Sequence, residues 1–290
     1  MGLGSLVKAA SAGPPSIKGT LRSFKRSEQV PYLTEDGWIR ASGFAMLCPR
    51  EEVLCARERL TRVREIETDL LLIFEHGNGL HDRLQNSILP GVGVLRGKWI
   101  CLGCGTMQGG PPPKDCSVNT DWAIPRPEKC EKCESTEFRF FEVEYYNYEL
   151  KLRGHTDGYL VLPGMSSIGV LEAKSIKPGW QIKNVPKMEH AVQLQQYLLL
   201  TGLQWGIILY WIKGENGTAA FVEHFVERDE GTLDSIRKTI LGIRSGITGG
   251  PLPEPVCATA TCPRASGCVV AEQCFATIEK PEEEEDDLPF

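Results

Sequence analysis

The chain has 290 residues, 41% of them hydrophobic and 24% charged, a composition typical of a soluble globular protein with one large domain or two small ones. The net charge of −6 arises at one end, because six of the 38 acidic residues lie in 282–287 and the other 32 balance the 32 basic residues. The most apolar stretch, 197–212, is too short to span a bilayer, and residues 1–29 lack the apolar core of a secretory signal, so we expect a cytoplasmic protein without a membrane anchor.

The N-terminal third is predicted to be a basic arm followed by helices. Residues 1–30 are rich in Gly, Ser and Pro and carry no acidic residue before Glu28, which indicates a mobile basic arm, either solvated or in contact with DNA. Residues 41–90 are expected to be helical, with Ser42 as an N-cap and Pro49 in a first helical turn. A helix from about residue 65 to residue 89 is expected to end at Pro90.

The eleven cysteines are clustered, and their odd number favours metal binding over disulfides. A strand at 99–101 leads into the pair Cys101 and Cys104, and a second pair, Cys130 and Cys133, follows a Gly- and Pro-rich loop. Two such pairs supply four thiolates for tetrahedral zinc, so we predict a zinc-ribbon insertion. A redox pair or spare core thiols are the alternatives, and Cys116 is left over.

The rest of the chain alternates between strand and helix patterns, which favours an α/β fold. The predicted strands lie at 137–147, 150–157, 159–162, 167–172, 205–212 and 219–228, and the predicted helices at 190–201 and 232–245. The loop 175–188 contains several lysines and Trp180, a combination that suits single-stranded nucleic acid but is also common on ordinary surfaces.

Two acidic residues lie at the ends of neighbouring predicted strands. Asp157 ends one strand, and Glu172 ends the next. Two carboxylates in this arrangement can share a divalent cation such as Mg²⁺, which prefers oxygen ligands. Lys174 follows Glu172 by two residues and therefore lies on the same face of the strand, where it can hold a metal-bound water or stabilise developing charge.

An Asp followed by Glu-x-Lys resembles the site of the PD-(D/E)XK nucleases. The chain is more specifically similar to RecB-type iron-sulfur exonucleases, including CRISPR-associated, AddB-like and phage members, because His81 precedes these strands and Gln193-x-x-x-Tyr197 follows them. The resemblance spans about residues 42–275, apart from the insertion. It implies a restriction-endonuclease-like core, a mixed central sheet flanked by helices.

The resemblance also implies roles for these residues. His81, Asp157, Glu172 and the carbonyl of Ala173 would bind Mg²⁺ or Mn²⁺. Lys174 would position or activate the attacking water. Gln193 and Tyr197, four residues apart and so on one helical face, would position the DNA backbone or support the metal site.

Iron-sulfur relatives combine one N-terminal cysteine with three C-terminal ones. The similarity therefore implies a cluster, expected to be 4Fe-4S, on Cys48, Cys262, Cys268 and Cys274, with Cys257 as a substitute. A zinc site made of the last four cysteines alone is the alternative. Cys55 is expected to be a small core residue.

The acidic tail, which ends in Phe290, resembles the tip of bacterial single-stranded-DNA-binding proteins. It is predicted either to recruit a replication or repair protein or to act only as a solubilising tail.

Together these features predict a metal-dependent DNA exonuclease of recombination, repair or replication in a bacterial or phage-infected cell. A structure-specific endonuclease and a non-catalytic DNA-end-binding scaffold are the alternatives. The expected segments are a basic arm (1–30), a helical part of the core (31–92), a zinc ribbon (93–140), a catalytic core (141–248), a cysteine segment (249–276) and an acidic tail (277–290).

Overall fold

The computed structural model describes residue 24 and residues 37–60, 68–110, 122–177, 186–213 and 219–276. Four features predicted from the sequence lie outside the described residues. They are the basic arm except Phe24, Cys116, residues 178–185 of the lysine-rich loop, and the acidic tail. No helix in the described ranges is long and apolar enough to cross a membrane.

A five-stranded mixed sheet forms the centre of the molecule, so the expected α/β class is confirmed. Its strands β9 and β10 run parallel, and every other neighbouring pair is antiparallel. Parallel neighbours need a crossover connection, and α6 lies between these two strands in the chain. The sheet order is β11 (Ala219–Glu227), β10 (Trp205–Lys213), β9 (Gly169–Ile176), β8 (Gly158–Leu160) and β2 (Leu95–Arg96).

Alternate residues of β9 and β10 contribute to two separate hydrophobic cores, one on each face of this sheet. Val170 and Ile208 pack in one core with Leu198 of α6. Leu171 and Ile207 point the other way and pack in a second core with residues that follow α4. A sheet that is apolar on both faces must be covered on both, and the nearly continuous apolar runs of β9 and β10 reflect this.

The helices differ from the prediction mainly at their ends. Ser42 lies inside a 3-10 turn and does not cap a helix; the N-cap of α3 is Cys48, and Pro49 takes the first helical turn as expected. Pro90 does not end the second helix, because that helix already changes into a π turn at 84–88 and Pro90 lies in the short helix beyond it. The bounds are α3 (Pro49–Arg57), α4 (Thr68–Arg83), α5 (Leu89–Gly91), α6 (Met188–Thr201), α7 (Glu230–Ile247) and α8 (Ala271–Ala276).

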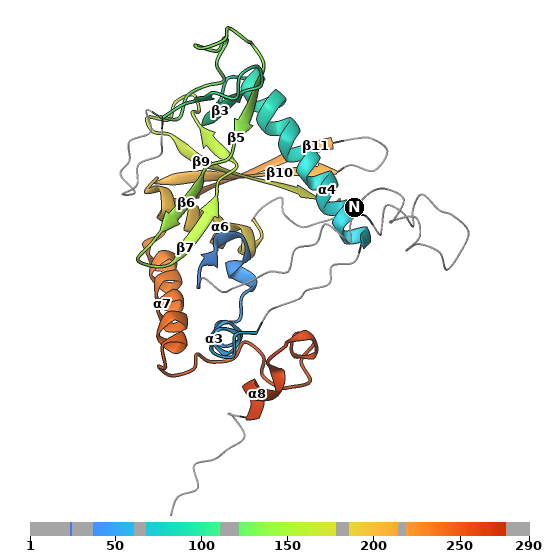
Figure 1. The fold of residues 1–290 in the computed structure, drawn as a ribbon, viewed down its shortest axis with the longest axis vertical. Helices are drawn as coiled ribbons and strands as arrows, with labels where there is room; N and C mark the ends of the chain where they lie inside the picture. The colour runs from blue at the N-terminus through green and yellow to red at the C-terminus, as the bar shows by residue number, and fades with distance from the viewer. Residues whose placement is uncertain are drawn as a thin grey trace, which may run out of the picture.

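Two three-stranded sheets flank the central one. In Figure 1 the sheet of β3, β4 and β5 lies at the top of the molecule, the β6–β7 hairpin lies lower, and α8 is near the bottom. The strand predicted at 137–147 is in fact two strands, since β5 pairs with β3 and β6 pairs with β7. Two exposed residues in succession, Phe141 and Glu142, mark the point where the chain changes sheets. The strand order in the first of these sheets is β4 (Met107–Gln108), β3 (Lys98–Cys101) and β5 (Phe138–Phe141). The strand order in the second is β1 (Ile39–Arg40), β7 (Leu152–His155) and β6 (Glu144–Asn147).

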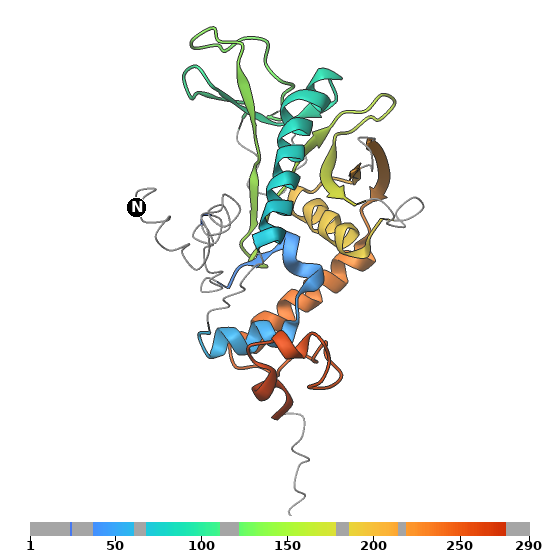
Figure 2. The same ribbon diagram turned by 90° about the vertical axis from the view of Figure 1, so that its right-hand side faces the viewer.

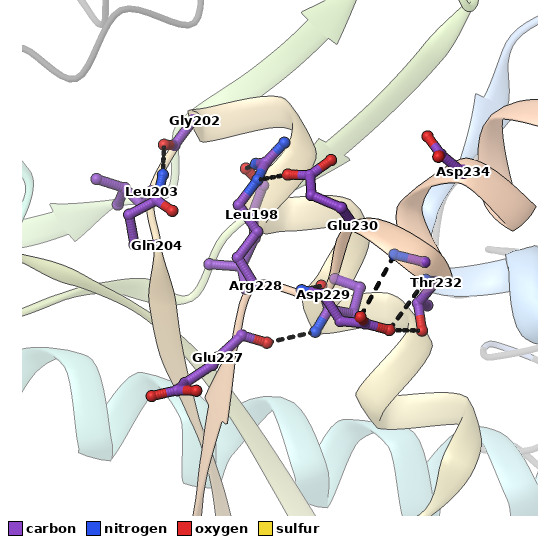
Figure 3. Close-up of polar contacts among 12 residues, drawn as sticks. Leu198, Gly202, Leu203, Gln204, Glu227, Arg228, Asp229, Glu230, Thr232 and Asp234 are labelled. Carbon is purple, nitrogen blue, oxygen red and sulfur yellow. Dashed lines mark hydrogen bonds and ion pairs between the residues drawn. The ribbon is translucent and has the colours of Figure 1, made fainter.

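A polar network fixes α6 to the turn between β11 and α7 (Figure 3). The buried side chain of Gln195 donates to the Glu227 carbonyl at 2.6 Å and accepts from the Asp229 backbone amide at 3.0 Å. The guanidinium of Arg228 donates to the Leu198 carbonyl at 2.6 Å, and the Asp229 carboxylate caps α7 by accepting from the amide of Thr232. Figure 2 shows α7 (orange) continuing from this region toward α3 (blue), with which it packs.

Replacing Gln195 with Leu should destabilise the protein by about 1–3 kcal/mol, because two backbone groups lose their partners while the volume is nearly kept. Gln204→Leu is the matched control, since the exposed Gln204 side chain donates to the nearby Gly202 carbonyl. The effect of this control should stay within about 0.5 kcal/mol. Urea unfolding of the two variants measures the difference. Equal stabilities would show that the network does not fix α6.

Candidate active site

The pairing of β8 with β9 sets the geometry of the candidate site. Gly158 lies opposite Leu171 in this antiparallel pair. Asp157, one residue before Gly158, is therefore placed beside Glu172, one residue after Leu171. The two predicted carboxylates are thus brought together by backbone register, from positions fifteen residues apart in the sequence.

Asp157 is held by three contacts. Its Oδ2 accepts a hydrogen bond from the backbone amide of Ala173 at 2.7 Å, and its Oδ1 lies 3.4 Å from Nδ1 of His81, on α4. Its backbone carbonyl accepts from Nε2 of Gln85 at 3.0 Å. Burial opposes ionisation of Asp157, but the hydrogen bond and charge of His81 outweigh it and lower the pKa of the carboxyl group. The same contact raises the pKa of His81 despite its burial.

Glu172 and Lys174 form a buried ion pair on one face of β9. The Glu172 side chain is almost fully buried, and its Oε1 is in contact with the Lys174 ammonium. Burial raises the pKa of Glu172 to about 7, against the opposing charge of Lys174. Burial alone would lower the pKa of Lys174, but Glu172 and Asp157 raise it, so the ammonium keeps its proton.

The helix α6 presents Gln193 and Tyr197 to the same site. Nε2 of Gln193 donates to the Tyr197 hydroxyl at 2.7 Å, and both side chains are buried. Burial, with added repulsion from the Glu172 and Asp157 charges, raises the pKa of Tyr197, so the phenol stays protonated. Gly154 on β7 allows this approach, because a Cβ there would lie 2.7 Å from the Tyr197 ring.

Sequence reasoning gave no role to Gln85, Glu142, His190 or Tyr210. Gln85 lies in the π turn at 84–88 and donates to both Asp157 and Glu142, the latter at 2.8 Å. π turns are often found at functional sites, but this one has no sequence signature. His190 bonds the Tyr210 hydroxyl at 2.8 Å, and Tyr210 pairs with Lys174 across the parallel strands. Burial and the nearby Lys174 lower the pKa of His190 to about 4, so this imidazole is neutral.

The donor set of this site fits a hard divalent cation. It offers one imidazole, two carboxylates and the backbone of Ala173, and such oxygen-rich sets suit Mg²⁺ and Mn²⁺. The Glu172 carboxylate is almost fully buried, and a buried carboxylate is stabilised by a nearby cation. His155, adjacent in sequence, instead faces Glu144 at 3.7 Å and is exposed.

A second group, the four-cysteine cluster, lies at the β3–β5 sheet. Within the described ranges it is the only set of three or more potential ligand atoms that all lie within 4.8 Å of one another. The Sγ atoms of Cys101 and Cys133 are 3.5 Å apart, and those of Cys104 and Cys130 are 3.7 Å apart. A hydrogen bond with Thr106 lowers the pKa of Cys104 to about 6, which favours the thiolate that binds metal. The cluster can therefore hold a metal ion.

The five remaining predicted ligands gather at the opposite end of the molecule, around α3. Cys257 and Cys262 lie 3.2 Å apart, and the electrostatic influence of Cys48 reaches Cys257, Cys268 and Cys274. Mutual hydrogen bonding with Cys262 and burial raise the pKa of Cys257 to about 11. Cys55 is buried against Leu54, Val270 and Cys274, as expected of a core residue.

No family model and no curated protein matches the chain. Among solved structures, a protein described as SSO0001 is 17% identical, with 79% of this chain and 87% of that one covered and a TM-score of 0.39. The alkaline exonuclease LHK-Exo from Laribacter hongkongensis is 12% identical, with coverage of 74% and 90% and a TM-score of 0.36. Its complex with dAMP gives 13% identity, coverage of 75% and 91%, and a TM-score of 0.40. TM-scores at this level do not assign a fold or an activity.

Binding of Mn²⁺ at this site should become tighter as the pH rises through about 7, because the ion must displace the proton from Glu172. Calorimetry in buffers of different ionisation enthalpy should show more protons released per ion at pH 6, where both Glu172 and His81 carry a proton, than at pH 8.5. In Glu172→Gln the release at pH 6 should fall by nearly one proton per ion and the affinity should fall, while the release from His81 remains. Equal proton release by the native protein and Glu172→Gln at pH 6 would contradict the assignment of Glu172 as a ligand.

Proposed function

We propose that this protein is a metal-dependent deoxyribonuclease with a restriction-endonuclease-like core of the PD-(D/E)XK type. The single observation that carries the proposal is the register that places Asp157 beside Glu172, with Lys174 paired to Glu172 and His81 in contact with Asp157. This is a complete set of side chains for metal-assisted phosphodiester hydrolysis.

His81, Asp157, Glu172 and the Ala173 carbonyl bind Mg²⁺ or Mn²⁺ in this proposal. When bound, such an ion polarises the phosphodiester and offsets the charge that develops in an in-line displacement. The imidazole of His81 must offer a lone pair, so its proton is lost when the cation binds. Gln85 holds the Asp157 backbone in position.

Lys174 positions or activates the attacking water. In the site without a cation, Glu172 and Asp157 raise the pKa of Lys174, so its ammonium donates hydrogen bonds there. A protonated Lys174 would orient that water and stabilise charge on the phosphoryl oxygens. The protonated Tyr197 and the amide of Gln193 supply further hydrogen-bond donors beside the carboxylates, where they position the DNA backbone or support the metal site.

Exonuclease action is the form of the activity that we propose, in recombination, repair or replication of bacterial or phage DNA. The acidic tail would recruit a replication or repair protein. The four-cysteine cluster would hold zinc as a ribbon that braces the insertion, and the cysteines around α3 would hold an iron-sulfur cluster.

Cleavage of DNA in Mg²⁺ or Mn²⁺ should fall about a thousandfold or more in Glu172→Gln, because the metal loses a charged ligand. Glu223→Gln, an exposed glutamate on β11 of the same sheet, is the matched control and should keep full activity. End-labelled linear DNA should shorten while closed circles survive. Cut circles would change the assignment to endonuclease, and absence of any cleavage by fully metallated protein would contradict the proposal.

Elemental analysis of anaerobically purified protein should find one zinc ion and one iron-sulfur cluster per chain, with the visible absorbance of the latter. Cys130→Ser should remove the zinc and leave the iron, whereas Cys48→Ser should remove the iron and leave the zinc. Cys55→Ser is the control, since this thiol is expected to pack in the core only. Zinc without iron at both sites would overturn the iron-sulfur assignment.

A further inference from the structure

The solvent-facing side of the sheet β1-β7-β6 carries an unusual set of side chains. Ile39, Leu152 and Tyr145 are buried on the inner face, so the alternate residues point outward. Arg153 lies opposite Arg40 on one side and opposite Tyr146 on the other. These three residues therefore form one row across the sheet.

Three aromatic rings meet at the end of this row. The ring of Trp38 contacts Tyr146 and Tyr148 edge-on, with centroids 5.3 Å away in both cases. Tyr146 and Tyr148 are nearly parallel, at 24° and 5.9 Å. Tyr148 is 74% exposed and Tyr146 is 37% exposed. Packing on Trp38 fixes the orientation of the two tyrosines while their rings stay open to solvent, which is the geometry of a stacking platform.

Cations surround these rings. Nζ of Lys151 lies 5.2 Å from the centre of the Trp38 ring, and Arg40 and Arg153 lie on the adjoining strands. Glu144 opposes them, because it pairs with Arg153 at 4.0 Å and with His155 at 3.7 Å, and it accepts a hydrogen bond from Tyr146. Glu149 lies in the turn before β7. Among the described residues named here, Arg40, Lys151 and Arg153 are cations and Glu144 and Glu149 are carboxylates. Cations beside exposed aromatic rings suit an anionic ligand with flat aromatic groups.

The chain that carries the outward row leads to the candidate active site. β7 ends at His155, and Asp157 follows in the bend that connects β7 to β8 of the central sheet. Arg153 and His155 both lie on the outward side of β7. Four residue steps separate Arg153 from Asp157, so at about 3.3 Å per residue the two lie within about 13 Å of each other, the length of about four stacked nucleotides.

We propose that this face binds single-stranded DNA, with unpaired bases stacked on Tyr148 and Tyr146 and phosphates near Arg40, Lys151 and Arg153. Stacking of this kind needs exposed base faces, which a duplex does not offer. The role in leading a strand to Asp157 rests on the proposed nuclease function, whereas the binding itself does not. A bound protein segment is the competing occupant.

Fluorescence anisotropy with a labelled single-stranded 15-mer, in buffer without divalent ions, tests the binding alone. Tyr148→Ala should weaken binding about 5- to 100-fold, and Tyr148→Phe should restore it. Phe221→Ala is the control, because Phe221 is a similarly exposed aromatic on β11, and should have no effect. Arg40→Gln combined with Arg153→Gln should reduce the slope of log affinity against log salt by about 0.7 for each phosphate that these arginines neutralise.

The proposal would be overturned if Tyr148→Ala bound single strands as tightly as the native protein, or if blunt duplex bound with equal affinity. It would also be overturned if single strands did not bind, and a protein segment would then remain as the occupant. Tighter binding of an RNA 15-mer would overturn the assignment to DNA. If the protein also cleaves DNA, Tyr148→Ala should raise KM for single strands and leave kcat unchanged. Single-strand binding without cleavage would contradict the nuclease proposal alone.

Discussion

The antiparallel pairing of β8 with β9 is the constraint on which the candidate site depends. It sets Asp157 beside Glu172, and the period of two along β9 then adds Lys174. Two carboxylates in a buried setting repel each other and lose hydration, which is costly unless cations compensate. Here His81 and Lys174 supply that compensation, one from α4 and one from the strand itself.

The surrounding helices hold this arrangement in place. Gln85 bonds the Asp157 backbone from the turn after α4, and Gln195 fastens α6, the helix that carries Gln193 and Tyr197. Each of these glutamines uses its amide to satisfy two partners, so neither can be replaced by an apolar side chain without leaving polar groups unpaired. These polar residues therefore stabilise the fold and also hold the residues of the candidate site in position.

Most of the strands could be predicted, because short runs that are apolar throughout or alternate between apolar and polar residues indicate strands. The pair of carboxylates could be predicted because each follows such a run. The division of the strand predicted at 137–147 into two strands could not be predicted. The alternation of buried and exposed residues is interrupted for only two residues where the chain passes from one sheet to the other. Gln85 could not be found either, because its role depends on a π turn that has no period of its own. The gathering of cysteines around Cys48 followed from family likeness, whereas the four-cysteine cluster followed from spacing alone.

The cysteines form two groups near opposite ends of the molecule. A metal ion on the four-cysteine cluster would brace the β3–β5 sheet above the central sheet (Figure 1). A cluster on the cysteines near α3 would join segments that are about two hundred residues apart in sequence. Closing a long loop removes more conformational entropy from the unfolded chain than closing a short one, so the second group has the larger potential effect on stability.

The proposed function requires that Asp157 and Glu172 share one divalent cation. Anomalous diffraction from crystals grown with Mn²⁺ would locate that ion. We expect a peak in contact with both carboxylates and the His81 imidazole, and its loss in Glu172→Gln crystals. A peak confined to the cysteines, or none near β9 at saturating Mn²⁺, would contradict a shared cation.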